Sequence, residues 1–258
     1  MRYDQISPVP PLTPVTKSII IACVGIYFGE LLLRGFGVDL SATFGLIPYA
    51  VWSQGAVWQL VTYIFLHGSP LHLLFNMLIL WFFGAEIEMR LGTARFARFF
   101  FLCGIGAGVF NLFVNIGVAY LMTGGNVAQW EALRVPIIGA SGAIFGILAA
   151  YGIFYADRYF LVFFLFPMRA RYFVLLIAGI ELLMGLEARR GDPVAHFAHL
   201  GGMAVGAAYI WWNFVRPKGG GSSASQRERE ELKKRFTLIV NEGKDAESRR
   251  GDDPNYWN

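Results

Sequence analysis

Six long apolar segments limit what this chain can fold into. They lie at residues 17–33, 60–83, 96–122, 136–155, 172–186 and 195–215. A helix needs about 20 mainly apolar residues to cross the hydrocarbon core of a bilayer. Only 16% of the residues are charged, against about a quarter in soluble domains. The sequence therefore predicts an all-α polytopic membrane protein with six transmembrane helices.

Two further apolar segments do not fit this pattern. Residues 36–59 are too polar and too often broken by glycine and proline to span, so we expect a first loop that is half-submerged at the interface. Residues 159–166 are too short to span and end at Pro167. We expect them to form either the interfacial end of the fourth segment or the link to the fifth.

Lysine and arginine favour one side of the membrane, and this sets the orientation. They gather near the N-terminus and after the second, fourth and sixth segments: Arg2, Lys17, Arg90, Arg95, Arg98, Arg158, Arg169, Arg171, Arg216 and Lys218. Because short cytoplasmic loops are rich in these residues, both termini are predicted to be cytoplasmic. The net charge of +4 is then explained by flanking residues, and no nucleic-acid partner is expected.

Three regions follow from this pattern. Residues 1–16 form a cytoplasmic N-terminal segment without a cleavable signal pattern, 17–215 the membrane domain, and 216–258 a flexible cytoplasmic tail that begins with a Gly/Ser linker. Both cysteines, Cys23 and Cys103, lie inside apolar segments, so a disulfide framework is not expected.

Strongly polar side chains within apolar segments are costly and mark candidate functional sites. His72 and Asn76 lie in the second segment, Ser141 in the fourth and His199 in the sixth. Even-numbered segments all run from the outside inward, which places these four side chains at one depth below the outer face. A hydroxyl, two imidazoles and an amide at one level are the components of an acyl-transfer site: a nucleophile, a base and oxyanion donors.

Glycine pairs give two of these segments a way to approach each other closely. Ser141 belongs to the small-residue turn Gly139-Ala140-Ser141-Gly142, and Gly146 follows Gly142 by four residues. Gly202 and Gly206 have the same spacing and share a face with His199. Packing of these two small-xxx-small ridges would bring Ser141 and His199 together.

Other interpretations of the same residues stay open at this point. Ser141 could be a packing residue bonded to its own helix, and the histidines could be structural or belong to an ion path. His196 and His199 could chelate a metal, but no acidic residue is expected at their depth, so neither a metal nor a cofactor is predicted. A transporter would show broken spans and carboxylates near the midplane, where Glu181 is the one deep candidate.

Four motifs resemble those of the rhomboid intramembrane serine proteases over residues 17–215. Gly139-Ala140-Ser141-Gly142 resembles the family's Gly-x-Ser-Gly, and Ala198-His199-Leu200-Gly201-Gly202 with Gly206 resembles its sixth-helix motif. His72-Leu73-Leu74-Phe75-Asn76 resembles His-x-x-x-Asn, with His67 matching an upstream histidine. The fourth motif, Gly-x-x-x-Glu followed by Leu-Gly, is matched by Gly84, Glu88, Leu91 and Gly92.

The resemblance implies a rhomboid-like bundle of six helices and an intramembrane serine endopeptidase. Ser141 would be the nucleophile and His199 the base, while His72, Asn76 and the Ser141 N–H would form the oxyanion hole. No carboxylate is expected beside the imidazole, so the pair would act as a dyad. The substrates would be transmembrane helices, cleaved near the outer face and admitted past the fifth segment and residues 186–194.

The chain departs from the family pattern at two positions. The first loop has Trp58-Gln59 where the family often has Trp-Arg, which puts the stability of that loop in doubt. Phe145 replaces a frequent tyrosine, and its ring could still pack under the base. His196 is out of register with the motif, so the resemblance implies a structural role there or a role at the rim of the site.

The alternative function is a non-proteolytic rhomboid-like membrane chaperone or dislocation factor, which the presence of both Ser141 and His199 disfavours. The short six-segment organisation points to a bacterial plasma membrane. The sequence does not fix the oligomeric state or the substrate.

Overall fold

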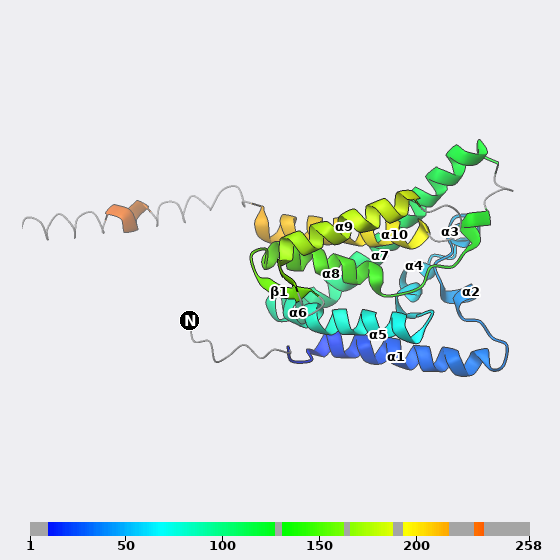
Figure 1. Ribbon diagram of the computed structural model, residues 1–258, viewed down its shortest axis with the longest axis horizontal. Helices are drawn as coiled ribbons and strands as arrows, with labels where there is room; N and C mark the ends of the chain where they lie inside the picture. Colours follow the sequence, from blue (N-terminus) through cyan, green and yellow to red (C-terminus); the bar gives the residue numbers. More distant parts are fainter. Residues whose placement is uncertain (1–9, 127–130, 163–165, 188–192, 217–229, 235–258) are drawn as a thin grey trace, which may run out of the picture. The chain divides into compact units, whose positions relative to one another are not determined.

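The computed structural model describes residues 10–126, 131–162, 166–187, 193–216 and 230–234. A helix lies on each of the six apolar segments (Figure 1). These are α1 (Pro14–Arg34), α5 (Pro70–Ile79) continued by η3 (Leu80–Gly84) and α6 (Ala85–Leu91), α7 (Thr93–Thr123), α8 (Ser141–Phe154), α9 (Ala170–Glu187), and α10 (Pro193–Ile210) continued by η6 (Trp211–Val215). The prediction of a mostly helical chain is confirmed, although η3 and η6 are π-helical.

The chain divides into two compact units, residues 1–214 and 215–258. In the second unit, residues 230–234 are helical. Apart from residue 216, the rest of the predicted tail at 216–258 falls outside the described residues. So does most of the predicted cap at 186–194.

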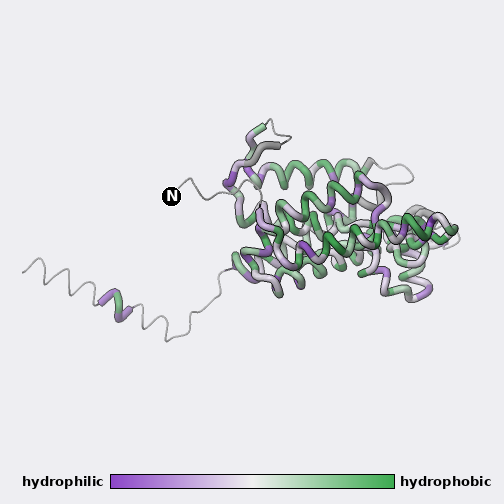
Figure 2. The backbone as a smooth tube through the Cα atoms, turned by 90° about the horizontal axis from the view of Figure 1, so that it is seen from below, coloured by the Kyte–Doolittle hydropathy of each residue, from purple (hydrophilic) through white to green (hydrophobic). Residues whose placement is uncertain are grey.

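Three helices in the described ranges are long and apolar enough to cross a membrane: Pro14–Arg34, Pro70–Leu91 and Thr93–Leu121. Figure 2 shows hydrophobic residues along most of the length of the long helices. α8 is also apolar but has only 14 residues, a length of about 21 Å.

α8 is the core helix of the first unit. It is apolar on all sides, as expected of a helix that is enclosed by others rather than facing solvent. Ten of its 14 residues are buried, and it packs against α7, α9 and α10. On α7, Phe96, Phe99, Phe100 and Cys103 are fully buried and belong to the same core. Enclosure of α8 places Ser141, its first residue, inside the bundle.

The first loop contains α2 (Ser41–Phe44), α3 (Pro48–Gln54), α4 (Gln59–Thr62) and the 3₁₀ turn η2 (Tyr63–Phe65). Gln59, which stands in place of the family's arginine, is buried and holds this loop. Its Oε1 accepts from the Ile47 N–H at 2.9 Å, and its Nε2 donates to the Thr43 carbonyl at 3.3 Å. The Gln59 amide therefore forms hydrogen bonds that stabilise the first loop, although the arginine that is frequent in the family is missing.

The second long helix begins at Pro70, not at residue 60 as predicted. Ser69 is its N-cap, with a hydroxyl that accepts from the His72 N–H at 3.2 Å, and proline occupies the first helical position. Both are strong helix-start signals. Because of this start, His67 lies in the connection before the helix.

Residues 159–169 depart from the all-α prediction. β1 (Tyr159–Val162) and β2 (Phe166–Arg169) pair antiparallel, with Tyr159 opposite Arg169. Aromatic and β-branched residues favour strands, and this run is too short to span. The link between α8 and α9 is therefore a β-hairpin.

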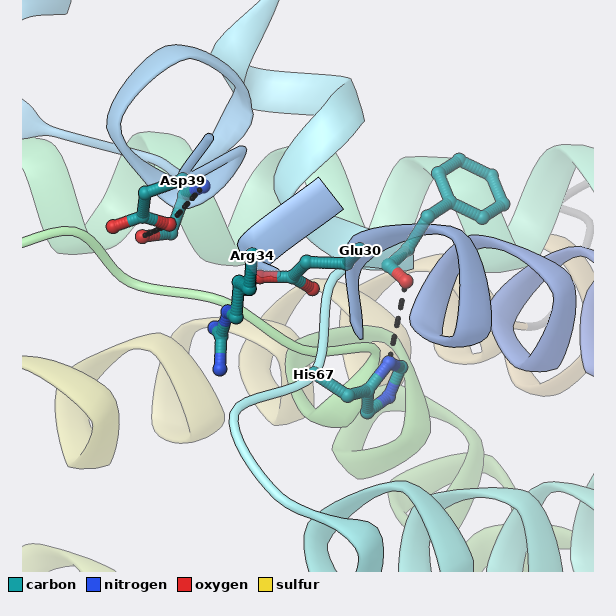
Figure 3. A network of polar contacts seen from close by, with 6 residues as sticks. Glu30, Arg34, Asp39 and His67 are labelled. Atoms are coloured by element: carbon teal, nitrogen blue, oxygen red, sulfur yellow. Dashed lines mark hydrogen bonds and ion pairs between the residues drawn. The ribbon is translucent and has the colours of Figure 1, made fainter. Parts of the chain in front are cut away.

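A buried carboxylate on α1 was not singled out by the sequence pattern. Glu30 is buried and accepts a hydrogen bond from Arg34, one turn later, at 2.7 Å (Figure 3). Figure 3 also shows His67, whose ring nitrogen Nδ1 is hydrogen-bonded to the Phe65 carbonyl. Pairing with Arg34 offsets part of the cost of burying the Glu30 charge.

Glu88 joins the N-terminus of α1 to α6. Its carboxylate accepts from the Val15 N–H at 3.0 Å and from the Thr16 N–H at 2.9 Å. The hydroxyls of Thr13 and Thr16 donate to it as well, at 2.5 and 3.0 Å. The first N–H groups of a helix lack intrahelical acceptors, and the helix dipole favours an anion there. A side chain more than 70 residues away in the sequence therefore caps α1.

We expect Glu88→Ala to destabilise the protein by about 3 kcal/mol, because it leaves buried N–H groups at the start of α1 without acceptors. Thermal unfolding in detergent measures this as a lowered Tm. Glu86→Ala is the matched control, since Glu86 forms a partly exposed ion pair with Arg158 and such pairs contribute less than about 1 kcal/mol. Equal losses in the two variants would contradict the capping role.

Candidate active site

The structure brings Ser141 and His199 into direct contact. The Ser141 Oγ lies 2.8 Å from the His199 Nε2, within hydrogen-bond range. Ser141 is the first residue of α8, and His199 lies on α10. The contact joins two residues 58 positions apart in the sequence, which the sequence placed at one depth but could not show to touch.

Glycines set the close approach of α8 and α10. A Cβ on Gly202 would overlap the Gly142 carbonyl. A Cβ on Gly206 would lie 2.5 Å from the Gly146 carbonyl oxygen, and one on Gly146 would lie 2.9 Å from the Gly202 carbonyl oxygen. The two predicted ridges therefore face each other, and backbone lies against backbone at both levels. This packing carries the imidazole of His199 to Ser141.

The segment before α8 is non-helical, but its backbone is hydrogen-bonded to the first loop. Leu46 and Ile137 exchange backbone hydrogen bonds of 2.9 Å, and the Gly139 N–H donates to the Tyr63 carbonyl at 2.9 Å. The first loop therefore fixes the point at which α8 begins. Irregular backbone at membrane depth is tolerated where other parts of the protein satisfy it.

Gly139 makes room for the ring of His72. Its φ is +129°, a conformation that side chains rarely adopt, and a Cβ there would lie 2.9 Å from the His72 Nε2 and 3.7 Å from the Ser141 Oγ. The His72 imidazole and the Ser141 hydroxyl therefore flank one glycine. Asn76 is buried, and its amide donates to the His72 carbonyl at 2.8 Å.

His67 supports His72 from the first loop. The two rings lie edge to face, with centroids 5.2 Å apart. Burial lowers the pKa of His67 to about 4, with a smaller contribution from His72, so His67 is neutral near pH 7. Its Nδ1 lies 3.3 Å from the Phe65 carbonyl, which can only accept, so this nitrogen carries the proton.

Phe145 packs against His199, as predicted. Its ring stacks on the His199 imidazole with centroids 4.2 Å apart and planes 4° from parallel. The expected ring packing at this position is therefore present.

The expectation that no carboxylate lies beside the imidazole is wrong. The Glu181 Oε2, from α9, lies 2.9 Å from the His199 Nδ1. The same oxygen lies 2.7 Å from the His196 Nδ1. Glu181 thus contacts both histidines of α10, and it is a residue of the site that sequence reasoning missed.

Glu181 could have been found by applying the depth argument to the fifth segment. In the predicted topology that segment runs from the inside outward, so a residue near its C-terminal end is expected near the outer face. Glu181 is five residues before Leu186, the end of the predicted segment, and is therefore on the level of Ser141.

Glu181, His196 and His199 could also be considered as metal ligands. Each offers one ligand atom, and these atoms lie within 4.8 Å of one another. The reasoning that no acidic residue shares the depth of the two histidines therefore does not hold.

Comparisons with known proteins show the family of this chain. The family model described as the Rhomboid domain matches residues 54–216. The chain is 31% identical over 163 residues to RHOMBOID-like protein 4 of Arabidopsis thaliana, an alignment that covers 62% of this chain and 35% of that protein. It is 29% identical over 148 residues to Rhomboid protein 1, mitochondrial, of Saccharomyces cerevisiae, covering 57% of this chain and 39% of that protein.

A third relative is the Rhomboid protease GlpG of Yersinia pseudotuberculosis, 26% identical over 207 residues, which covers 78% of this chain and 63% of the relative. The alignments thus span between about a third and two thirds of the length of these three curated relatives. The family match includes the helices that carry His72, Ser141, Glu181 and His199. This chain belongs to the rhomboid family of membrane proteins.

Proposed function

We propose that this protein is an intramembrane serine endopeptidase that cleaves transmembrane helices near the outer membrane face. The hydrogen-bond distance of 2.8 Å between the Ser141 Oγ and the His199 Nε2 carries the proposal. A serine hydroxyl is a weak nucleophile until a base in hydrogen-bond reach takes its proton.

The proposed reaction is acyl transfer followed by hydrolysis. His199 takes the Ser141 proton as the hydroxyl attacks the substrate carbonyl, and then gives it to the leaving amine. Water enters and releases the acyl group from Ser141 by the same proton transfers in reverse.

The oxyanion that forms during attack needs hydrogen-bond donors. The Ser141 N–H belongs to the first turn of α8, where N–H groups lack intrahelical acceptors and the dipole favours negative charge. His72 is the second proposed donor, because its ring and the Ser141 hydroxyl flank Gly139. Asn76 is the third: its amide nitrogen carries two hydrogens, of which one is used on the His72 carbonyl.

The proposed membrane arrangement has six crossings, both termini in the cytoplasm and the first loop half-submerged. With α8 only 14 residues long, a helix that starts below the outer face can still reach the inner one, since the core is about 30 Å thick. Substrate helices would enter past α9. The proposed location is a bacterial plasma membrane.

A fluorophosphonate probe tests this function, because an activated serine oxygen attacks its phosphorus, displaces fluoride and becomes phosphonylated. We expect covalent labelling of the wild-type protein in lipid and none of Ser141→Ala. Labelling is read by gel fluorescence, and the modified peptide by mass spectrometry. A folded wild-type protein that stays unlabelled would refute the protease and favour a non-proteolytic relative.

A further inference from the structure

We propose that Glu181 is a positioning residue that holds the tautomer and orientation of His199, so that the site works as a Ser–His–Glu triad. This inference deepens the proposed function and rests on it. It concerns which tautomer and orientation the His199 imidazole adopts, because the presence of a nucleophile and a base does not determine either.

The first argument is the direction of the hydrogen bonds. An ionised carboxylate only accepts, so the His199 Nδ1, 2.9 Å from the Glu181 Oε2, must carry a proton. In a neutral imidazole the other nitrogen then has the lone pair. That nitrogen is the Nε2, which faces the Ser141 Oγ at 2.8 Å. The contact with Glu181 therefore selects the one neutral tautomer that can take the serine proton.

The second argument is that the carboxylate is itself held in place. The His196 Nδ1 lies 2.7 Å from the same oxygen, and the Glu181 side chain is only 12% exposed. His196 lies one turn before His199 on α10, so a rigid helix fixes the spacing of both contacts. Phe145 stacks on the His199 ring and restricts its tilt. The imidazole is thus constrained in its plane by Glu181 and across its plane by Phe145.

The third argument is the position of Glu181 in an apolar helix. Its neighbours Leu182 and Leu183 are exposed at the surface of α9, and a carboxylate in such a helix is costly without partners. Gly185, one turn later, allows α9 to approach α10: a Cβ there would lie 3.4 Å from the His196 Cβ. The approach of the two helices brings Glu181 to both imidazoles.

The distances favour hydrogen bonds over a shared metal ion. Ligand atoms around a tetrahedral zinc, at about 2.0–2.1 Å from the metal, are about 3.3 Å apart. The two contacts of Glu181, at 2.7 and 2.9 Å, are shorter than this. They are ordinary charge-assisted hydrogen-bond distances.

The test compares full-length wild type, Glu181→Gln, Glu181→Ala and Glu181→Asp for fluorophosphonate labelling rate and for kcat and KM on a transmembrane-helix substrate. We expect Glu181→Gln to lower kcat and the labelling rate by about 10²–10⁴-fold with KM unchanged, since loss of an orienting carboxylate removes the correct tautomer. Glu181→Asp keeps the charge and should recover part of the rate. Glu86→Gln, the same change at a carboxylate paired with Arg158, should label like wild type.

The outcomes separate this inference from the proposed function. Wild type that is not labelled defeats the function itself. If wild type is labelled and Glu181→Gln, folded by its Tm, reacts equally fast, the function stands and the triad is wrong. Loss of wild-type labelling on treatment with 1,10-phenanthroline would also overturn the triad, because Glu181 would then hold a metal. If Glu181→Ala does not fold, the labelling rate and kcat of the isosteric Glu181→Gln variant test the triad.

Discussion

His199→Ala should reduce cleavage of a transmembrane-helix substrate to background, a loss on the order of 10⁴–10⁶ in kcat. The reason is the single contact of 2.8 Å between the His199 Nε2 and the Ser141 Oγ, which leaves the serine without a proton acceptor when the ring is removed. The measurement is single-turnover cleavage in liposomes, with far-UV circular dichroism to establish that the variant is folded.

His196→Ala is the control for this prediction. It removes the same ring type from the same helix, one turn away. His196 contacts Glu181 but has no hydrogen bond to Ser141 among the described contacts. We expect a loss of about fivefold, the equivalent of one net hydrogen bond of about 1 kcal/mol. An inactive His196→Ala beside an active His199→Ala would reverse the assignment of the base.

Gly202→Ala should both destabilise the fold and inactivate the site. The added methyl group would overlap the Gly142 carbonyl. A backbone carbonyl cannot relieve the overlap by changing rotamer, as a side chain could. Overpacking typically costs about 1–3 kcal/mol, and we expect the upper end here. The separation of α8 from α10 would also pull His199 from Ser141, so kcat should fall even at temperatures where the variant is folded.

Gly179→Ala is the matched control for the packing prediction. Gly179 lies in α9, and a Cβ there meets no atom within 4 Å. Alanine is the better helix former by about 1 kcal/mol, so Tm should stay or rise slightly. If Gly202→Ala left Tm and kcat unchanged, the glycine contact would not be what joins the two helices. Thermal unfolding and kcat are measured on both variants.

The sequence predicted the helices and most of the site because both depend on local patterns. Long apolar runs mark helices, and the direction of even-numbered segments puts Ser141 and His199 on one level without any tertiary information. The glycine pairs, spaced four residues apart, then indicated which faces of α8 and α10 pack against each other. Those faces lie in contact at Gly142 and Gly202.

The remaining features depend on contacts between distant segments or on competing local signals. Glu181 was set aside because depth was compared among even-numbered segments alone. The start of the second long helix was placed too early, since apolar character continues through residues 60–66 while the Ser69-Pro70 signal fixes the helix later. The β-hairpin after α8 could not be distinguished from a short helical link by length.

The Glu88 contact also has a consequence for the order in which the chain can be completed. The amides at the start of α1 are capped by a residue 72 to 75 positions further along. At a synthesis rate of about 5–20 residues per second, the ribosome needs roughly 4–15 seconds more to reach that glutamate. During this interval the first turn of α1 has water or lipid headgroups as its partners. The N-terminus of α1 can therefore be capped only after α6 has been synthesised, about a third of the way along the 258 residues.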